Sequence, residues 1–376
     1  MDEKVIIDGG WGGDTMQLCA TLLANNVDVL GTTTVFGNAK IDKINENAHD
    51  ILHFLNADHV PIYSGAEKPS SGEAQFDGAH KEDGRGGARL ETVKSRIRKP
   101  AKNYGIDNDG VNFILQTVEG HPGEITLMSS GPVTNIAQAI KLRPDIMAKV
   151  KQIVIMGGCT KPMKANDAPP EDKAVGKDFR SGNITRASEF NFNTAPDDAK
   201  TVMDSGLPIV LLPMNCTHKL TVTPDRQRAI MDALSDHPEA AQAVLTMMTA
   251  PADFDRRKFD IDPVMHDVNC ALYLLHPELY RTEKGNVAVS AEPATPEEMA
   301  RLPYVLGEPK EILGHTEFTA DPNSKTTVAI GFKEPEKETA DQLFDIYLNS
   351  LVSCISRERS WADDAEGQRR SELRFR

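Results

Sequence analysis

The chain has 376 residues and a formal net charge of −14. This length can bury a large core in one domain, or conceivably in two. The acidic balance argues against nucleic-acid binding, since a polyanion attracts basic proteins. No apolar run is long enough to predict a membrane span, and the start, Met1-Asp2-Glu3-Lys4, does not resemble a secretory signal. Five cysteines without a CxxC pair favour reduced thiols in a cytoplasmic protein.

Short apolar runs alternate with longer helical segments. Val5-Ile6-Ile7 predicts a first buried strand, followed by a helix from about Asp14 to Asn25 and a second strand at Val27–Val35. Three further strands are predicted, at Glu124–Met128, Gln152–Met156 and Pro208–Leu212. Because continuous hydrophobicity is typical of strands covered on both faces, the predicted fold class is α/β, with a mainly parallel central sheet and helices on both faces.

The later part of the chain is expected to be more helical. From about Asn215 onward, Pro224–Leu234 and Val264–Leu275 predict helices. The segment Thr160–Gly182 is too polar for a regular element and too long for an average loop, which is typical of lids or mobile insertions. We expect one domain over residues 1–356, carrying this insertion at 160–182, and a charged, frayed tail over 357–376.

Ligands of an α/β sheet bind beyond the carboxyl ends of its parallel strands. The functional candidates are therefore expected in the loops that follow Ile7, Val35, Met128 and Met156.

Several separated stretches, spread over roughly residues 4 to 350, follow one another in the order known from a single protein family. They are Thr33–Asn38, Gly123–Leu127 with Ser130–Ala137, Ile155–Gly158, Gly182-Asn183, Ser188–Asn191, Pro208-Ile209, Asn215–His218 and Met265–Asp267. In this order they resemble the inosine–uridine nucleoside hydrolase family.

The resemblance implies a Rossmann-like nucleoside hydrolase fold and hydrolysis of the N-glycosidic bond between ribose and a base. In that family a calcium ion, held by aspartates of an N-terminal loop, a backbone carbonyl and a late aspartate, binds a water and the ribose 2′ and 3′ hydroxyls. Calcium suits such a cage of hard oxygens, and holding water beside the sugar favours their reaction. A small-molecule nucleoside or riboside is the implied partner, and a homo-oligomer is implied by analogy alone.

The site residues are carried over position by position. The resemblance implies Asp14 and His266 as catalytic groups, the histidine as an acid for the leaving base. It implies Asp14, Asp267 and the backbone carbonyl of Ser130 as metal ligands. The implied substrate-binding residues are Asp8, Asn38, Met156, Asn183, Glu189 and Asn191, and to these we add Trp11, whose ring could stack on a base or sugar.

The N-terminal loop, Asp8-Gly9-Gly10-Trp11-Gly12-Gly13-Asp14, departs from the family pattern. The family's second aspartate, a ligand and general base, falls on Gly10, and another ligand falls on Thr15. Because calcium affinity depends on the number of charged ligands, a weakened calcium site is expected. Loss of a general base alone would slow the reaction by about 10²–10⁴-fold.

Three interpretations stay open at this point. The first is an N-riboside hydrolase with an altered site, and the second is a non-catalytic nucleoside- or sugar-binding homologue. The third is a phosphate or dinucleotide binder that uses the Gly-rich loop, although this loop spells no GxGxxG and has no P-loop lysine. Asp14 with Gln17 also fits a capping box, while His80 and His218 are expected to be structural or rim residues.

Overall fold

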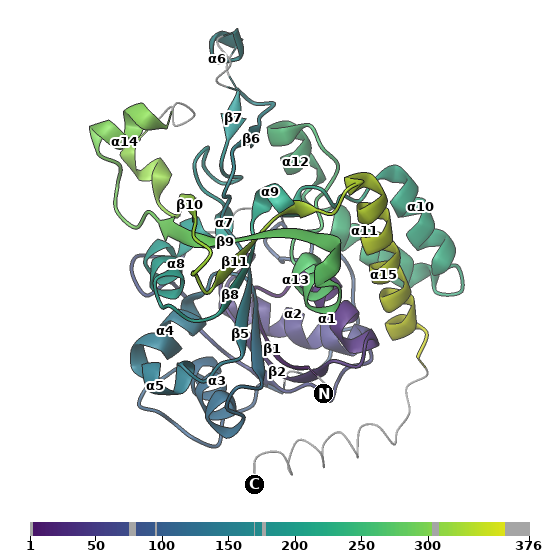
Figure 1. The fold of residues 1–376 in the computed structure, drawn as a ribbon. Coiled ribbons are helices and arrows are strands. Elements are labelled where there is room, and N and C mark those ends of the chain that lie inside the picture. Colours follow the sequence, from purple (N-terminus) through teal and green to yellow (C-terminus); the bar gives the residue numbers. More distant parts are fainter. Residues whose placement is uncertain are drawn as a thin grey trace.

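The computed structural model describes residues 3–74, 80–94, 96–168, 170–174, 178–302 and 308–357. A nine-stranded sheet runs through the centre of this part of the chain, in the order β10-β9-β11-β8-β5-β4-β1-β2-β3 (Figure 1). Its seven strands from β11 to β3 are parallel, and β9 and β10 are added antiparallel at one edge.

The five strands expected from continuous apolar runs are confirmed, with shifts of a few residues at their ends. They are β1 (Lys4–Gly9), β2 (Asp28–Thr34), β4 (Ile125–Ser130), β5 (Gln152–Met156) and β8 (Ile209–Leu212). A two-residue strand, β3 (Ile62–Tyr63), completes the edge beside β2.

Helices cover both faces of the sheet, as predicted (Figure 1). One layer contains α1 (Gly13–Ala24), α2 (Ile41–Phe54), α10 (Pro224–Ala233), α11 (Pro238–Thr249), α13 (Val268–Leu275) and α15 (Glu336–Ile355). The other contains α3 (Asp109–Gly120), α4 (Thr134–Leu142), α5 (Pro144–Met147) and α8 (Pro196–Met203). Shorter helices are α6 (Pro170–Ala174), α7 (Phe190–Thr194), α9 (Met214–Thr217), α12 (Ala252–Phe259), α14 (Pro296–Arg301) and the 3-10 turns Pro277–Leu279 and Pro309–Ile312.

The two layers follow from the alternation of side chains along each strand. Val5 and Ile7 of β1 join the core beneath α1 and α15, whereas Ile6 joins the core beneath α3 and α4. Each buried strand thus needs apolar residues at successive positions, which is the pattern that its sequence shows. The carboxyl ends of the parallel strands share one edge of the sheet, and loops from both layers meet there.

The C-terminal half is less purely helical than expected. Besides α10 and α13, it contributes three strands that the sequence analysis missed: β9 (Tyr280–Val289), β10 (Thr316–Ala320) and β11 (Thr326–Phe332). The reason is visible in β9, whose residues 281–284 are all exposed. A strand that is exposed over several successive residues shows no continuous apolar run.

Two local predictions are corrected. Asp14 is not the N-cap of the first helix: Gly12 holds that position, and Asp14 lies in the first turn, where its Oδ1 accepts a hydrogen bond from Gln17 Nε2 at 3.2 Å. The insertion 160–182 is not without elements, since its described residues form a small hairpin of β6 (Met163–Lys164) and β7 (Phe179–Arg180), with α6 between them. The expected tail lies almost wholly outside the described residues.

No helix in the described ranges is both long and apolar enough to cross a membrane. All five cysteines are buried and unpaired.

The loop between β1 and α1 generates a first prediction. A Cβ on Gly12 would lie 2.5 Å from the backbone carbonyl oxygen of Gly84, whereas a Cβ on Gly10 would meet nothing closer than 3.7 Å. Gly12→Ala should therefore lower the free energy of unfolding by about 1–3 kcal/mol through overpacking. Gly10→Ala, the matched control, should leave it nearly unchanged, as measured by urea unfolding. Equal losses in both variants would contradict the close approach at Gly12.

Candidate active site

The expected site residues come together at the carboxyl edge of the sheet. Gly9, the last residue of β1, lies opposite Thr34 of β2 and Ser130 of β4. Met156 ends β5 two strands away from β1. The first turn of α1 follows β1 after three residues, so Asp14 is held over these strand ends.

Trp11 does not offer a ring to a ligand, which corrects its expected stacking role. Its side chain is 0% exposed within the core beneath α1, and its Nε1 donates a hydrogen bond to Thr32 Oγ1 at 3.0 Å. Asn47 Nδ2 donates to the Trp11 carbonyl at 3.1 Å. The aromatic ring thus anchors the N-terminal loop to β2 and α2.

The glycine-rich loop is not an open phosphate cradle either. The carbonyl of Gly84 covers Gly12 closely, and Met247 of α11 lies within 3.0 Å of the position of a Cβ on Gly13. These glycines allow close packing of neighbouring segments, so the geometry conflicts with the third interpretation.

Asp8 and Asn38 both form hydrogen bonds that hold the loop between β1 and α1 in place. Asp8 is 1% exposed, and its Oδ1 accepts hydrogen bonds from Thr33 Oγ1 at 2.6 Å and Asn135 Nδ2 at 2.7 Å. Burial raises the pKa of Asp8 to about 7 against the opposing effect of these two donors. Asn38 Nδ2 donates to the Gly10 carbonyl at 3.0 Å. Both side chains therefore hold backbone and neighbouring side chains in the structure.

Thr15 links two of the expected metal ligands. Its hydroxyl lies 3.1 Å from Ser130 Oγ, and it also forms a hydrogen bond with the carboxylate of Asp267. Asp267 is 5% exposed and immediately precedes α13. Burial, followed by the charges of Asp14 and Glu189, raises the pKa of Asp267 well above its ordinary value. The charges of Asp14 and Glu189 therefore both act on the carboxyl of Asp267.

Glu189 and Asn191 complete a group of polar residues that we call the cluster, together with Asp14 and Asp267. Glu189 is the N-cap of α7, and its carboxylate accepts hydrogen bonds from the backbone N–H groups of Gly158 (2.9 Å), Asn191 (2.9 Å) and Phe192 (3.2 Å). Burial still raises its pKa to about 7. Asn191 Nδ2 donates to the Met156 carbonyl at 3.1 Å, which fixes the orientation of its amide. Met156 thus contributes through its backbone, and the cluster is rigidly tied to the end of β5.

Asn183 is engaged by the backbone of the same region. Its Oδ1 accepts a hydrogen bond from Phe190 N at 2.9 Å, and its carbonyl accepts one from Lys258 of α12. These contacts connect the segment at the end of the insertion to α7 and α12. Asn183 therefore holds backbone next to Glu189 and Asn191 in place.

His266 is held as a neutral imidazole. Burial lowers its pKa to about 3, and Nδ1 shares a hydrogen bond of 2.7 Å with Thr217 Oγ1. Burial also lowers the pKa of the neighbouring His218 well below its ordinary value. A neutral ring can donate an N–H hydrogen bond but is a poor source of a proton. In this environment His266 can act toward a leaving base through an N–H hydrogen bond, and its expected role as the acid stays a prediction.

Two residues beside the cluster were not singled out as functional by sequence reasoning. His80, expected to be structural or a rim residue, has Nε2 3.9 Å from Asp14 Oδ2. Asp255 of α12 is 3% exposed, and burial raises its pKa to about 7, with a further contribution from Asp14. No local pattern marks Asp255, because only the packing of α12 over the sheet brings it near a residue 241 positions earlier.

The donor set does not fit the calcium cage that the resemblance implies. Within the ranges that the structure describes, no three His, Cys, Asp or Glu side chains are grouped so that they could hold a metal ion. The hydroxyl of Thr15 contacts Ser130 and Asp267 where the family places a further carboxylate. A hydroxyl supplies no negative charge, which calcium affinity requires.

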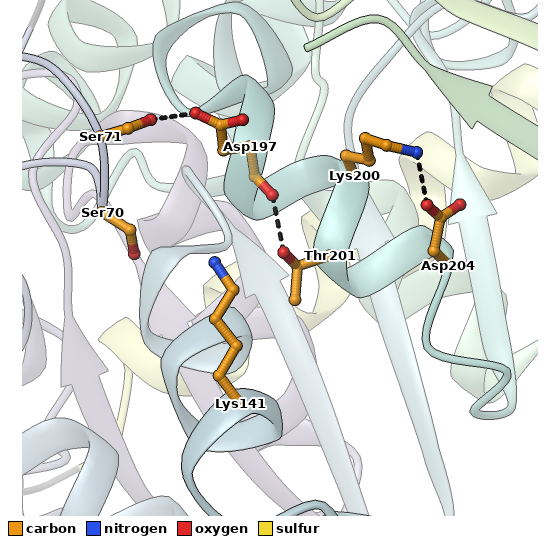
Figure 2. A pocket seen from close by; sticks show the side chains of 7 residues that line it. All are labelled: Ser70, Ser71, Lys141, Asp197, Lys200, Thr201 and Asp204. Carbon is orange, nitrogen blue, oxygen red and sulfur yellow. Dashed lines mark hydrogen bonds and ion pairs between the residues drawn. The ribbon is translucent and has the colours of Figure 1, made fainter.

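A surface depression of about 370 Å³ lies away from this cluster, at the junction of α4, α8 and the segment around Ser70 (Figure 2). Figure 2 shows that Lys200 pairs with Asp204 and that Ser71 donates a hydrogen bond to Asp197. None of the expected site residues lines it.

The buried carboxyl of Asp8 generates a prediction for stability against pH. Its folded pKa of about 7 exceeds its ordinary value of 3.8, so the folded state binds more protons between these two pH values. The stabilising contribution is present below pH 3.8 and is lost as pH rises through about 7. Asp8→Asn keeps an oxygen at the Oδ1 position but cannot titrate. In this variant the free energy of unfolding should therefore decrease less between about pH 5 and pH 8 than it does in the natural chain. The exposed Asp204→Asn serves as control; an unchanged slope in Asp8→Asn would contradict the prediction.

Comparisons with known proteins identify the family of the chain. Residues 5–332 match the inosine-uridine preferring nucleoside hydrolase family. An uncharacterized protein of Schizosaccharomyces pombe is 30% identical over 292 residues, covering 77% of this chain and 85% of its own. The pyrimidine-specific ribonucleoside hydrolase RihB of Escherichia coli O1:K1 / APEC is 28% identical over 291 residues, covering 76% of this chain and 83% of its own. A purine-preferring ribonucleoside hydrolase from Gardnerella vaginalis shares the fold, with a TM-score of 0.74 and 20% identity over 94% of this chain and 99% of that chain. The chain therefore belongs to the inosine-uridine preferring nucleoside hydrolase family and is a nucleoside hydrolase-like protein, of the enzyme class that hydrolyses N-glycosyl bonds.

Proposed function

We propose that the cluster of Asp14, Asp267, Glu189 and Asn191 hydrolyses the bond between C1′ of a ribose and the nitrogen of a base. The substrate is a ribonucleoside or a related N-riboside. What supports this proposal is that α1, α7 and the start of α13 bring Asp14, Glu189 and Asp267 to the carboxyl edge of the sheet, where Thr15 joins Ser130 and the Met156 carbonyl orients Asn191.

The sugar is expected to bind at the end of β5. Buried carboxylates need hydrogen-bond donors, and the hydroxyls of a ribose supply them. Glu189 is fixed by three backbone N–H groups, and Asn191 by the Met156 carbonyl. These contacts leave little side-chain entropy to lose on binding, so the sugar meets a preorganised surface.

Water is expected to attack C1′ from the side of Asp14. The carboxylate of Asp14 accepts the proton of this water, which makes it a general base. Asp267, on which the charge of Asp14 acts, in its ionised form stabilises the oxocarbenium-like sugar that forms as the bond to the base lengthens. His266 contributes at most a hydrogen bond, since burial keeps its ring neutral.

A second candidate function is binding of a riboside without hydrolysis. Gly10 and Thr15 favour it, because neither can supply the carboxylate that the family has at these positions. Release of ribose distinguishes the two functions: a hydrolase releases it catalytically, and a binding protein returns the riboside intact.

The cluster generates a prediction for activity. Asp267→Asn and Asn191→Ala should each lower kcat/KM for a riboside substrate by about 10²-fold or more, because each removes a group that contacts the sugar. The measurement is a reducing-sugar assay over a panel of ribosides. Asp262→Asn is the matched control: it lies in the same connecting segment and pairs only weakly with Arg256, at 3.7 Å.

Retained activity in both cluster variants would place catalysis elsewhere. A panel that shows calorimetric binding but no ribose release would establish the second candidate function instead.

The altered loop generates a prediction for metal binding. The double variant Gly10→Asp, Thr15→Asp restores two carboxylates, and the open space beside Gly10 accommodates a Cβ. Millimolar calcium should then raise the melting temperature of the variant by several degrees, since ligand binding stabilises the folded state by mass action. The natural chain should shift by less than a degree under the same conditions. An equal shift in both proteins would show that the natural donor set already binds calcium.

A further inference from the structure

Three side chains in the buried stretch of α1, Thr15–Leu22, carry polar oxygen or nitrogen atoms. Thr15 forms the contact with Ser130 described above, and the Thr21 hydroxyl donates to a carbonyl of its own helix at 2.9 Å. The third side chain, Gln17, is 1% exposed and reaches back to the first turn of the helix. Its amide connects this buried stretch to the carboxylate of Asp14.

The contact between Gln17 and Asp14 distinguishes the two oxygens of the carboxylate. The residues are three positions apart, so their side chains share one face of α1. Gln17 Nε2 donates to Asp14 Oδ1 at 3.2 Å. An ionised carboxylate offers only acceptors, so the NH2 group of the amide must face it. Asp14 Oδ2 lies 3.9 Å from His80 Nε2, which is beyond hydrogen-bond distance. Oδ1 is therefore held by the helix itself, and Oδ2 is directed toward the segment around His80.

The other half of the Gln17 amide does not help to stabilise the fold. Its Oε1 is buried and has no hydrogen-bond partner among the residues that the structure describes. A buried acceptor without a donor destabilises the folded state, and an apolar side chain of the same shape avoids this cost. Stability therefore gives no reason for a glutamine at this position. What the polar side chain supplies is the hydrogen bond to Asp14.

We infer that Gln17 is a positioning residue of the proposed reaction, whose amide holds the Asp14 carboxylate so that Oδ2 faces the attacking water. This inference rests on the proposed function and adds to it a residue that acts on the general base. Gln17 is buried behind Asp14 and acts through it, so it affects the chemical step and not the binding of the riboside.

Orientation matters here because a general base must lie within hydrogen-bond reach of the proton that it accepts. A misplacement of about 1 Å can slow a reaction by about 10²-fold. Asp14 lies in the first turn of α1, where a carboxylate can also turn toward the backbone N–H groups of the helix start. The bond from Gln17 Nε2 restrains this rotation.

The experiment uses Gln17→Met, which keeps the length of the side chain and removes the donor. Ribose release from inosine and from uridine is measured by a reducing-sugar assay over a range of concentrations, so that kcat and KM are obtained separately. We expect kcat to fall by about tenfold or more, and KM to stay within about twofold. The melting temperature should be equal to or higher than that of the natural chain, because the unsatisfied Oε1 is removed as well.

Thr117→Val is the matched control. Thr117 of α3 is 1% exposed, and its Oγ1 is likewise buried without a partner in the described ranges. The substitution makes the same kind of change, from an unsatisfied oxygen to an apolar group, in the other layer of helices. It should also keep or raise the melting temperature, and it should leave both kcat and KM unchanged.

A double-mutant cycle tests whether Gln17 acts through Asp14. Asp14→Ala removes the proposed base and should lower kcat by about 10²-fold or more. Adding Gln17→Met to this variant should cause no further loss, because the group that it positions is already absent.

The outcomes separate the two proposals. An unchanged kcat in Gln17→Met, or a further loss when it is added to Asp14→Ala, overturns the positioning role, while the loss in Asp14→Ala alone still supports the proposed function. A fall in kcat that is accompanied by a lower melting temperature assigns Gln17 a structural role and overturns the inference as well. No release of ribose by the natural chain, from inosine, uridine or any other riboside of a wide panel, overturns both proposals.

Discussion

The hydroxyl of Thr15 contacts both Ser130 Oγ and the carboxylate of Asp267, and the chemistry of the site depends on this arrangement. A hydroxyl satisfies one lone pair of a buried carboxylate but leaves its charge unbalanced. Burial is the largest cause of the raised pKa values of Asp267, Glu189 and Asp255, and at Asp267 the hydrogen bond from Thr15 opposes it. The fold therefore holds several carboxyl groups in buried positions near the carboxyl edge of the sheet.

The rigidity of this arrangement comes from the parallel sheet. Asp14 follows β1 by a loop whose glycines allow Gly84 and Met247 to pack closely, and Trp11 fixes that loop to Thr32 and Asn47. The positions of these carboxyl groups are fixed, because their backbones belong to strand ends and helix starts.

The sequence predicts the sheet better than the site. Runs such as Gln152–Met156 identify central strands because both of their faces are buried, whereas β9 escapes detection because residues 281–284 are exposed. The resemblance to a known family identified Asp267 and Glu189 as site residues. It did not predict how deeply they are buried, which determines their pKa values. Trp11 could equally have stacked on a ligand, and only its 0% exposure assigns it to the core. Asp255 carries no signal at all, since its place is set by how α12 packs over distant residues.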